Sequence, residues 1–249
     1  MAGDLIDGFD HAIVGVENLE AARLSWQRLG FTTCPRGKHI GWGTANYCIM
    51  FPDDYVELLG IVDASQFTNN LDTLLAERGE GLLGMAFASS HIDELAEKLD
   101  GQPQDLKRLL ELPEGTVEPR FKLMHPPIGT LPGLSGFFVD HLTPELMRQP
   151  QWLAHANGAT GIASVTVGVA DILAAREVYV GLFGEDFVNG SINIVAGEAG
   201  FSRLALKVAD VDATRAFLSD AQVTFNESDD GLSITPDKAT GAALSFVPG

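Results

Sequence analysis

Apolar and polar residues alternate along residues 8–16, as they do in a strand with one buried face. A helical pattern follows and ends at Gly30. Asn18 is placed to cap this helix, and apolar residues recur along one of its faces at Leu19, Ala22, Trp26 and Leu29. Extended stretches come next at 31–35, 43–51 and 55–61, with turns at 35–42 and 52–54. The pattern predicts a βαβββ unit.

The same order of elements begins again three times, so that the four starts fall near residues 8, 82, 161 and 201. Asp93 and Asp171 are the expected helix caps of the second and third units. Residues 105–112 fit a helix or a strand, and we assign a strand because the repeat requires one. We predict an α+β fold of four βαβββ-type modules, paired into two curled mixed-sheet half-barrel domains, with the second pair shortened. The domains are expected at 1–148 and 160–249, joined by a linker.

Composition narrows the class of partner. The chain has 34 acidic and 16 basic residues, a net charge of −18, which would repel a nucleic-acid backbone. No apolar run approaches the about 18 residues of a membrane span, and the first ten residues are acidic, unlike a signal peptide. We therefore expect a cytoplasmic protein with no nucleic-acid or membrane partner. Cys34 and Cys48 are expected to be reduced thiols that pack in the core.

Several motifs in order resemble one superfamily. Paired βαβββ modules with "DHAIVGVENLEAA", "LGF", "GTAN" and "YVELLG" resemble the vicinal oxygen chelate superfamily, in its glyoxalase-like branch, and "HANGATGIASVTVGVAD" extends the resemblance into the third module. The superfamily also includes antibiotic-binding proteins and extradiol dioxygenases. The resemblance implies that two modules form a curled sheet around one divalent metal ion, but it does not fix the reaction.

The resemblance places the metal ligands on the first and last strands of paired modules. In the first module these positions hold His11 and Glu57. In the second, Phe138, Val139 and Asp140 repeat the aromatic, aliphatic, acidic order found before Glu57, and Met85 stands where a fourth ligand would be. The expected ligands are therefore His11, Glu57 and Asp140, with Met85 on the substrate side, and the ion is Zn, Mn, Fe(II) or Ni. Loss of the fourth ligand is equally compatible with a decayed site.

Each ligand residue also has a purely structural alternative. A single histidine in a strand is more often packed or hydrogen-bonded than bound to metal. Glu57 is surrounded by apolar residues, so it needs a cation, a donor or a proton. Asp140 lies at a strand end, where an exposed acid is ordinary. His141 is its neighbour and is expected on the opposite face of the strand. We nevertheless predict that His11 and Glu57 share one pocket.

A second polar segment lies at residues 37–46. His39, Thr44 and Asn46 are expected at the edge of the substrate pocket, with His39 as a catalytic group beside Glu57. Arg120 could hold a substrate carboxylate or form a surface ion pair. In the second half, Ser164 and Arg203 align with His11, and the last strand has no acid, so no metal site is expected there.

Three functions stay open at this point. The first is metal-assisted isomerase- or lyase-type chemistry on a small carbonyl or hydroxy compound, in which the ion polarises the substrate and Glu57 or His39 moves a proton. The second is an extradiol-type dioxygenase, for which a second histidine ligand is missing at Met85. The third is metal-free binding or sequestration of a small molecule. The second half is expected to cover the first, narrow substrate access or form a homodimer surface.

Overall fold

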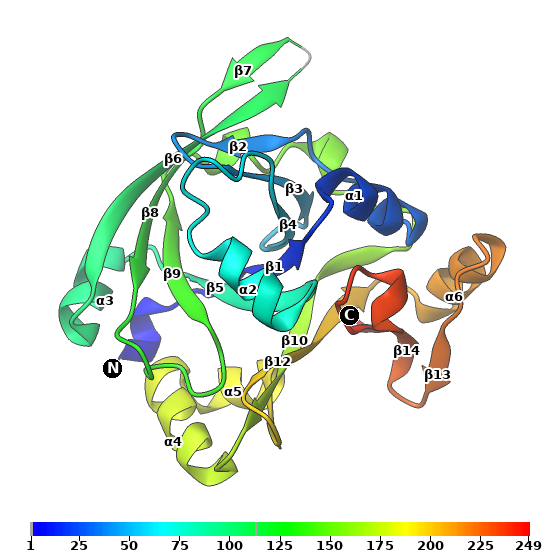
Figure 1. The fold of residues 1–249 in the computed structure, drawn as a ribbon. Helices are drawn as coiled ribbons and strands as arrows, with labels where there is room; N and C mark the ends of the chain where they lie inside the picture. The colour runs from blue at the N-terminus through cyan, green and yellow to red at the C-terminus, as the bar shows by residue number, and fades with distance from the viewer. Residues whose placement is uncertain (1, 113) are drawn as a thin grey trace.

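The computed structural model describes residues 2–112 and 114–249, and its first sheet closes into a barrel (Figure 1). The strand order is β2-β3-β4-β1-β5-β9-β8-β6-β7. Because β2 also pairs with β6, eight strands form a closed ring and β7 extends from β6 as a hairpin. The strands are β1 Gly8–Val16, β2 Gly37–His39, β3 Thr44–Met50, β4 Tyr55–Ile61, β5 Gly81–Ala88, β6 Gln102–Leu112, β7 Gly115–Val117, β8 Arg120–His125 and β9 Gly136–His141.

The helices of the first half pack outside this ring. They are α1 Leu19–Arg28, α2 Leu71–Arg78 and α3 Ile92–Leu99, with a short 3-10 helix η1 at Ala2–Leu5. The Asn18 side chain caps α1 by accepting a hydrogen bond from the Ala21 amide at 3.0 Å, as predicted. The cap expected at Asp93 is wrong, since His91 is the N-cap of α3. Asp93 lies in the first turn instead, where its carboxylate contacts Lys122.

Two strand predictions in the first half have different outcomes. Residues 105–112 are confirmed as part of strand β6. The strand expected at 31–35 is wrong, because β2 lies at Gly37–His39, inside the predicted turn. The alternation in that turn is too short to detect, and β2 is fixed by its two neighbours, β3 and β6.

The second half forms an open, curled sheet with the order β11-β10-β12-β15-β14-β13. Its central antiparallel pair, β10 with β12, repeats the pairing of β1 with β5, which confirms the predicted repeat and its shortening. The side chain of Asp171 caps α4, as predicted. The elements are η2 Pro144–Leu146, η3 Pro150–Trp152, β10 Ala159–Val169, α4 Ile172–Phe183, α5 Glu185–Ser191, β11 Ile192–Ala196, β12 Gly200–Val208, α6 Val211–Asp220, β13 Asn226–Ser228, β14 Gly231–Ile234, η4 Pro236–Lys238 and β15 Leu244–Pro248.

One apolar core joins the outer face of the barrel to the second sheet. Aromatic pairs cross between the halves, with ring centroids 4.5 Å apart for Phe87 and Phe183 and 6.0 Å apart for Phe31 and Phe246. The segment between the sheets is also held, since the buried Asn157 side chain donates to the Leu29 carbonyl at 2.8 Å. A separate apolar cluster fills one part of the barrel interior. Among the described residues, no helix has the length and apolar character needed to cross a membrane.

Candidate functional site

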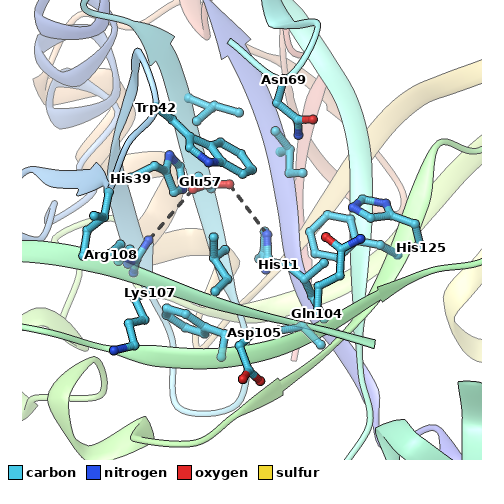
Figure 2. A pocket seen from close by; sticks show the side chains of 18 of the residues that line it. His11, His39, Trp42, Glu57, Asn69, Gln104, Asp105, Lys107, Arg108 and His125 are labelled. Carbon is cyan, nitrogen blue, oxygen red and sulfur yellow. Dashed lines mark ion pairs between the residues drawn. The ribbon is translucent and has the colours of Figure 1, made fainter. Parts of the chain in front are cut away.

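The barrel encloses a cavity of about 590 Å³, which is in the range of small-molecule sites. Its walls come from β1, β2, β4, β6, β8 and β9 and from the loops after β2 and β4, so they draw on most of the ring. The lining is mainly apolar and aromatic, and includes Tyr55, Phe121 and Phe137. A cluster of polar groups, His11, His39, Glu57 and Arg108, lies on one side (Figure 2).

Glu57 lies between His11 and Arg108 in this cluster, as Figure 2 shows. The distance from His11 Nε2 to Glu57 Oε2 is 3.6 Å, and that from Arg108 Nη1 to Glu57 Oε1 is 3.9 Å. All three side chains are at least nine-tenths buried. The structure therefore brings His11 and Glu57 into one pocket, although 46 residues separate them along the chain.

A carboxylate that sequence analysis missed, Asp10, orients His11. The pairing of β1 with β5 shifts register between Phe9 and His11, and Asp10 is the unpaired residue of this irregularity. Such a bulge re-aims a side chain, so neighbours in sequence need not face opposite sides of the sheet. Asp10 Oδ1 lies 2.5 Å from His11 Nδ1, and Asp10 Oδ2 lies 2.9 Å from His141 Nε2. Although burial raises the pKa of Asp10, the charge of His141 and the hydrogen bond from His11 hold it well below its usual range.

The ionised Asp10 fixes which nitrogen of His11 carries a proton. A carboxylate only accepts hydrogen bonds, so His11 Nδ1 must donate to it. His11 Nε2 is then free to act towards Glu57 and the cavity. Tyr55 keeps the ring in place, because it stacks on the imidazole with centroids 4.4 Å apart. Asp10 thus acts on the site through His11.

Glu57 is also held in its charged form. Burial raises the pKa of Glu57, but its electrostatic interactions with His11, His39 and Arg108, together with a hydrogen bond from Asn46 Nδ2, bring it below its usual range. Asn46 does not line the cavity and stands behind Glu57. Its observed contact is therefore with the carboxylate, whereas we expected a contact with substrate.

His39 lies on the cavity wall, as expected for a residue at the pocket. Its Nδ1 is 2.8 Å from Thr44 Oγ1, and its ring packs at 5.4 Å from that of Trp42. Burial lowers the pKa of His39, so its imidazole is neutral near pH 7. Thr44 does not line the cavity and contacts His39 instead of a substrate position.

Arg108 is the second residue that sequence analysis missed. Closure of the barrel pairs His39 on β2 with Arg108 on β6, and directly opposed residues of antiparallel strands share a face. Along β6, Leu106, Arg108 and Leu110 have the period of two that indicates one side of a strand. That alternation was the available signal, but without a predicted β2 there was no strand to place opposite Arg108.

The structure does not bring Asp140 together with His11 and Glu57 at the cavity. The parallel registers pair Ile13 with Glu57 on β1 and β4, and Ala88 with Val139 on β5 and β9. Val139, which lines the cavity, therefore takes the place of Glu57 in the second module. The sequence analysis matched Asp140 to Glu57, whereas the residue that matches Glu57 is Val139, one position earlier. A shift of one residue along a strand moves a side chain to the other face of the sheet. His141 faces inward, and Asp140 outward, the reverse of our expectation.

Met85 likewise does not lie at the fourth ligand position, where the sequence analysis expected it. His11 pairs with Ala86 on the neighbouring strand, and Tyr55 and Phe137 occupy matching positions in the two modules. Ala86 therefore corresponds to His11. Met85 points into the apolar core outside the barrel, where it is fully buried away from the cavity.

The remaining residues singled out from the sequence lie away from the cavity. The Arg120 side chain is 58% exposed and pairs with Glu118 at 3.6 Å, so it has the surface role that we left open. In the second half, Ser164 accepts a hydrogen bond from Asn193, and Arg203 donates one to Ser245, both at the surface. Cys34 and Cys48 are free thiols in the barrel's inner apolar cluster, which agrees with a packing role.

Comparison with known proteins identifies the family of this chain. The model of the Glyoxalase-like domain family matches residues 9–183, which include β1 to α4 and every residue of the polar cluster. The chain belongs to the glyoxalase-like domain family. No curated protein matches it significantly.

Solved structures confirm the fold of this glyoxalase-like protein. A hypothetical protein from Staphylococcus aureus has a TM-score of 0.69 and 15% identity, with 97% of this chain and 99% of that one covered. A 4-hydroxymandelate synthase variant from Streptomyces coelicolor has a TM-score of 0.60 and 11% identity, with 98% and 93% covered. A fusion protein of a xylose isomerase-like TIM barrel and 4-hydroxyphenylpyruvate dioxygenase has a TM-score of 0.53 and 12% identity, with 98% and 49% covered. At these identities the likeness shows the fold alone.

The polar cluster of this glyoxalase-like protein does not fit a divalent metal ion. His11 Nε2 and Glu57 Oε2 are two suitable donors, but the matching positions of the second module are apolar, at Ala86 and Val139. Across residues 2–112 and 114–249, no three histidine, cysteine, aspartate or glutamate side chains are arranged to hold one ion. The buried guanidinium of Arg108 also faces Glu57 and would repel a cation.

Proposed function

We propose that the barrel cavity is the active site of an enzyme that moves a proton on a small carbonyl or hydroxy compound, in an isomerase- or lyase-type reaction. The observation that carries this proposal is the buried Glu57 carboxylate on the cavity wall, 3.6 Å from His11 Nε2 and beside Arg108. A desolvated carboxylate next to a second proton carrier and a fixed positive charge is a common arrangement for acid–base catalysis.

In this reaction Glu57 takes a proton from a carbon next to a carbonyl group. The electron pair of the broken C–H bond moves into the carbonyl, and the oxygen becomes negatively charged. His39, which is neutral near pH 7 and lies on the same wall, takes part in transferring a proton to or from a substrate oxygen. Apolar walls around Tyr55 and Phe137 exclude water and so strengthen these charge interactions. The proton returns at a neighbouring atom in an isomerisation, or a leaving group departs in a lyase reaction.

Solvent hydrogen exchange tests the proposal across a range of candidate substrates. The protein is incubated in D2O with a panel of 2-hydroxy ketones and 2-oxo acids, and loss of the proton next to each carbonyl is followed by NMR. We expect at least one compound to exchange faster than without protein. Glu57→Gln should lower this rate by about 100-fold or more, the usual contribution of a positioned base.

Glu118→Gln is the matched control, because Glu118 is a partly exposed carboxylate on the outside of the barrel. It should exchange substrate at the wild-type rate. Equal rates for wild type and Glu57→Gln would contradict the assignment of Glu57 as the base. Absence of exchange across the panel would contradict the proton-transfer function.

Binding without turnover is the second candidate. It is supported by the apolar residues Ala86 and Val139 at the positions that match His11 and Glu57. This function predicts that compounds from the panel bind in the cavity while none of them exchanges. A ring-cleaving dioxygenase has less support, since Ala86 stands where its second histidine ligand would be needed.

A further inference from the structure

Among the residues that the structure describes, the buried guanidinium of Arg108 has no oxygen acceptor at hydrogen-bond distance. Arg108 is 3% exposed, and its guanidinium donates hydrogen bonds to two sulfur atoms, Cys48 Sγ at 3.5 Å and Met147 Sδ at 3.0 Å. Its Nε has no acceptor among the described residues. Thiol and thioether sulfurs are weak acceptors, whereas a guanidinium carries five N–H donors. A buried charge left in this state is costly to the fold, which indicates that a ligand satisfies it.

Glu57 does not account for Arg108 by itself. A structural arginine–carboxylate pair normally forms two parallel hydrogen bonds below about 3 Å. Here the closest approach, 3.9 Å between Arg108 Nη1 and Glu57 Oε1, is too long for one. Glu57 Oε1 instead accepts a hydrogen bond from Asn46. The two charges attract each other, but the donor groups of the guanidinium remain available.

The surroundings hold the guanidinium in a fixed plane at the cavity wall. It lies over the Phe121 ring, 5.3 Å from the ring centroid, and Phe121 itself lines the cavity. Asp105 and Lys107 also border the cavity, but they alternate with Arg108 along β6, and Lys107 already pairs with Glu118 at 3.2 Å. Within the polar cluster, Arg108 is therefore the group suited to a planar anion.

We propose that the cavity takes an organic anion, with its carboxylate on the Arg108 guanidinium and its apolar or aromatic body against Tyr55, Phe121 and Phe137. This inference rests on the proposed function, because it names the substrate class of the same cavity. It also assigns to Arg108 the part that a metal ion would play, since a fixed cation holds the substrate oxygens beside the base. The carbon atoms next to the carboxylate would then lie near Glu57.

Binding of two nearly isosteric probes tests the inference. Phenylacetate and phenylacetamide have similar shape and differ in charge, and their affinities are measured by titration calorimetry near pH 7. Trp42, which lines the cavity, supplies a fluorescence signal as a second readout. A charge-assisted pair with Arg108 predicts that wild type binds the carboxylate about 10- to 100-fold more tightly than the amide.

Arg108→Met removes the charge at similar volume and should abolish the preference for the carboxylate while the amide still binds. Arg108→Lys keeps the charge without the planar fork and should reduce the preference. Arg120→Met is the matched control, because Arg120 is exposed on the neighbouring strand β8 and should bind both probes as wild type does.

Equal affinities in wild type, an unchanged preference in Arg108→Met, or failure of both probes to bind would overturn the inference. If Arg108→Met does not fold, judged by circular dichroism, an unchanged preference in Arg108→Lys has the same meaning. The binding assay needs no turnover, so it separates this inference from the proposed function. Carboxylate preference without hydrogen exchange would refute the proton-transfer function alone.

Discussion

At the scale of single residues, Asp10 determines how the polar cluster is held. It is 1% exposed and lies between two imidazoles, with contacts of 2.5 Å to His11 and 2.9 Å to His141. Its ionised carboxylate accepts a hydrogen bond from His11 and lies in ion-pair contact with the His141 imidazole. The site residues Glu57 and His39 likewise depend on Asn46 and Thr44 behind them. Polar residues outside the cavity thus set the charge and orientation of those inside it.

Asp10→Asn should lower the free energy of unfolding by about 2–4 kcal/mol near pH 7, because it leaves two buried imidazoles without their carboxylate. The pKa of Asp10 lies below its usual range in the fold, so its contribution is present above about pH 4 and is lost as the pH falls further. The difference in unfolding free energy between wild type and Asp10→Asn should therefore become smaller below about pH 4. Urea unfolding at several pH values measures it.

Asp93→Asn is the control, since its exposed pair with Lys122 should contribute less than about 1 kcal/mol. Equal stability of wild type and Asp10→Asn at pH 7 would show that Asp10 does not hold the cluster.

At the scale of elements, strand register explains which predictions held. Local sequence patterns identified β1, β3 and β4 and the caps of α1 and α4, whereas β6 was assigned from the repeat because its own pattern fits a helix or a strand. Local patterns could not give the register between β5 and β9, which depends on pairing, and an error of one residue exchanged Asp140 for Val139. The bulge at Asp10 and the seam between β2 and β6 are likewise properties of pairs of strands. Asp10 and Arg108 were missed for that reason.

Asp54 links the two halves and gives stability a distinctive pH dependence. It precedes β4, is buried, and accepts hydrogen bonds from the Ile162 amide on β10 at 3.0 and 3.1 Å. Burial raises the pKa of Asp54 to about 7, so between about pH 4 and 7 the folded state binds a proton that the unfolded state has released. Its contribution to stability is therefore full below about pH 4 and is lost as the pH rises to 7.

Asp54→Asn keeps an acceptor oxygen and removes the titration. Relative to this variant, wild type should lose about 2–4 kcal/mol of unfolding free energy between pH 4 and pH 7. Urea unfolding of both proteins across this pH range measures their difference in unfolding free energy. Because both proteins contain the same histidines, the pH-dependent contributions of these histidines cancel in that difference. Asp53→Asn changes the exposed neighbour, whose charge adds to the raised pKa of Asp54, and should still lose stability between pH 4 and pH 7 as wild type does. Parallel curves for wild type and Asp54→Asn would contradict the assigned titration.

At the scale of the whole molecule, the repeated modules divide two tasks. The first pair closes a barrel around the cavity, whereas the second pair forms an open sheet that packs on the barrel's outer face. Residues of β1 and β5 that point outward, such as Val14 and Phe87, belong to this shared core, and His11 and Tyr55 point inward. The repeat, its pairing and the family could be predicted from local motifs. Whether the site has a full set of metal ligands could not be predicted in this way. It depends on the side chains that sister strands place at positions that only the strand register defines.

If Arg108 and Glu57 take the place of a metal centre in this member of the family, the cavity should hold no divalent ion. Elemental analysis tests it most directly, on wild type and His11→Ala, each incubated with excess Zn, Mn, Fe(II) or Ni and then passed through gel filtration. Far less than one bound ion per chain is expected in both proteins, and wild type should keep its preference for phenylacetate over phenylacetamide. One ion per chain in wild type that is lost in His11→Ala would contradict this expectation.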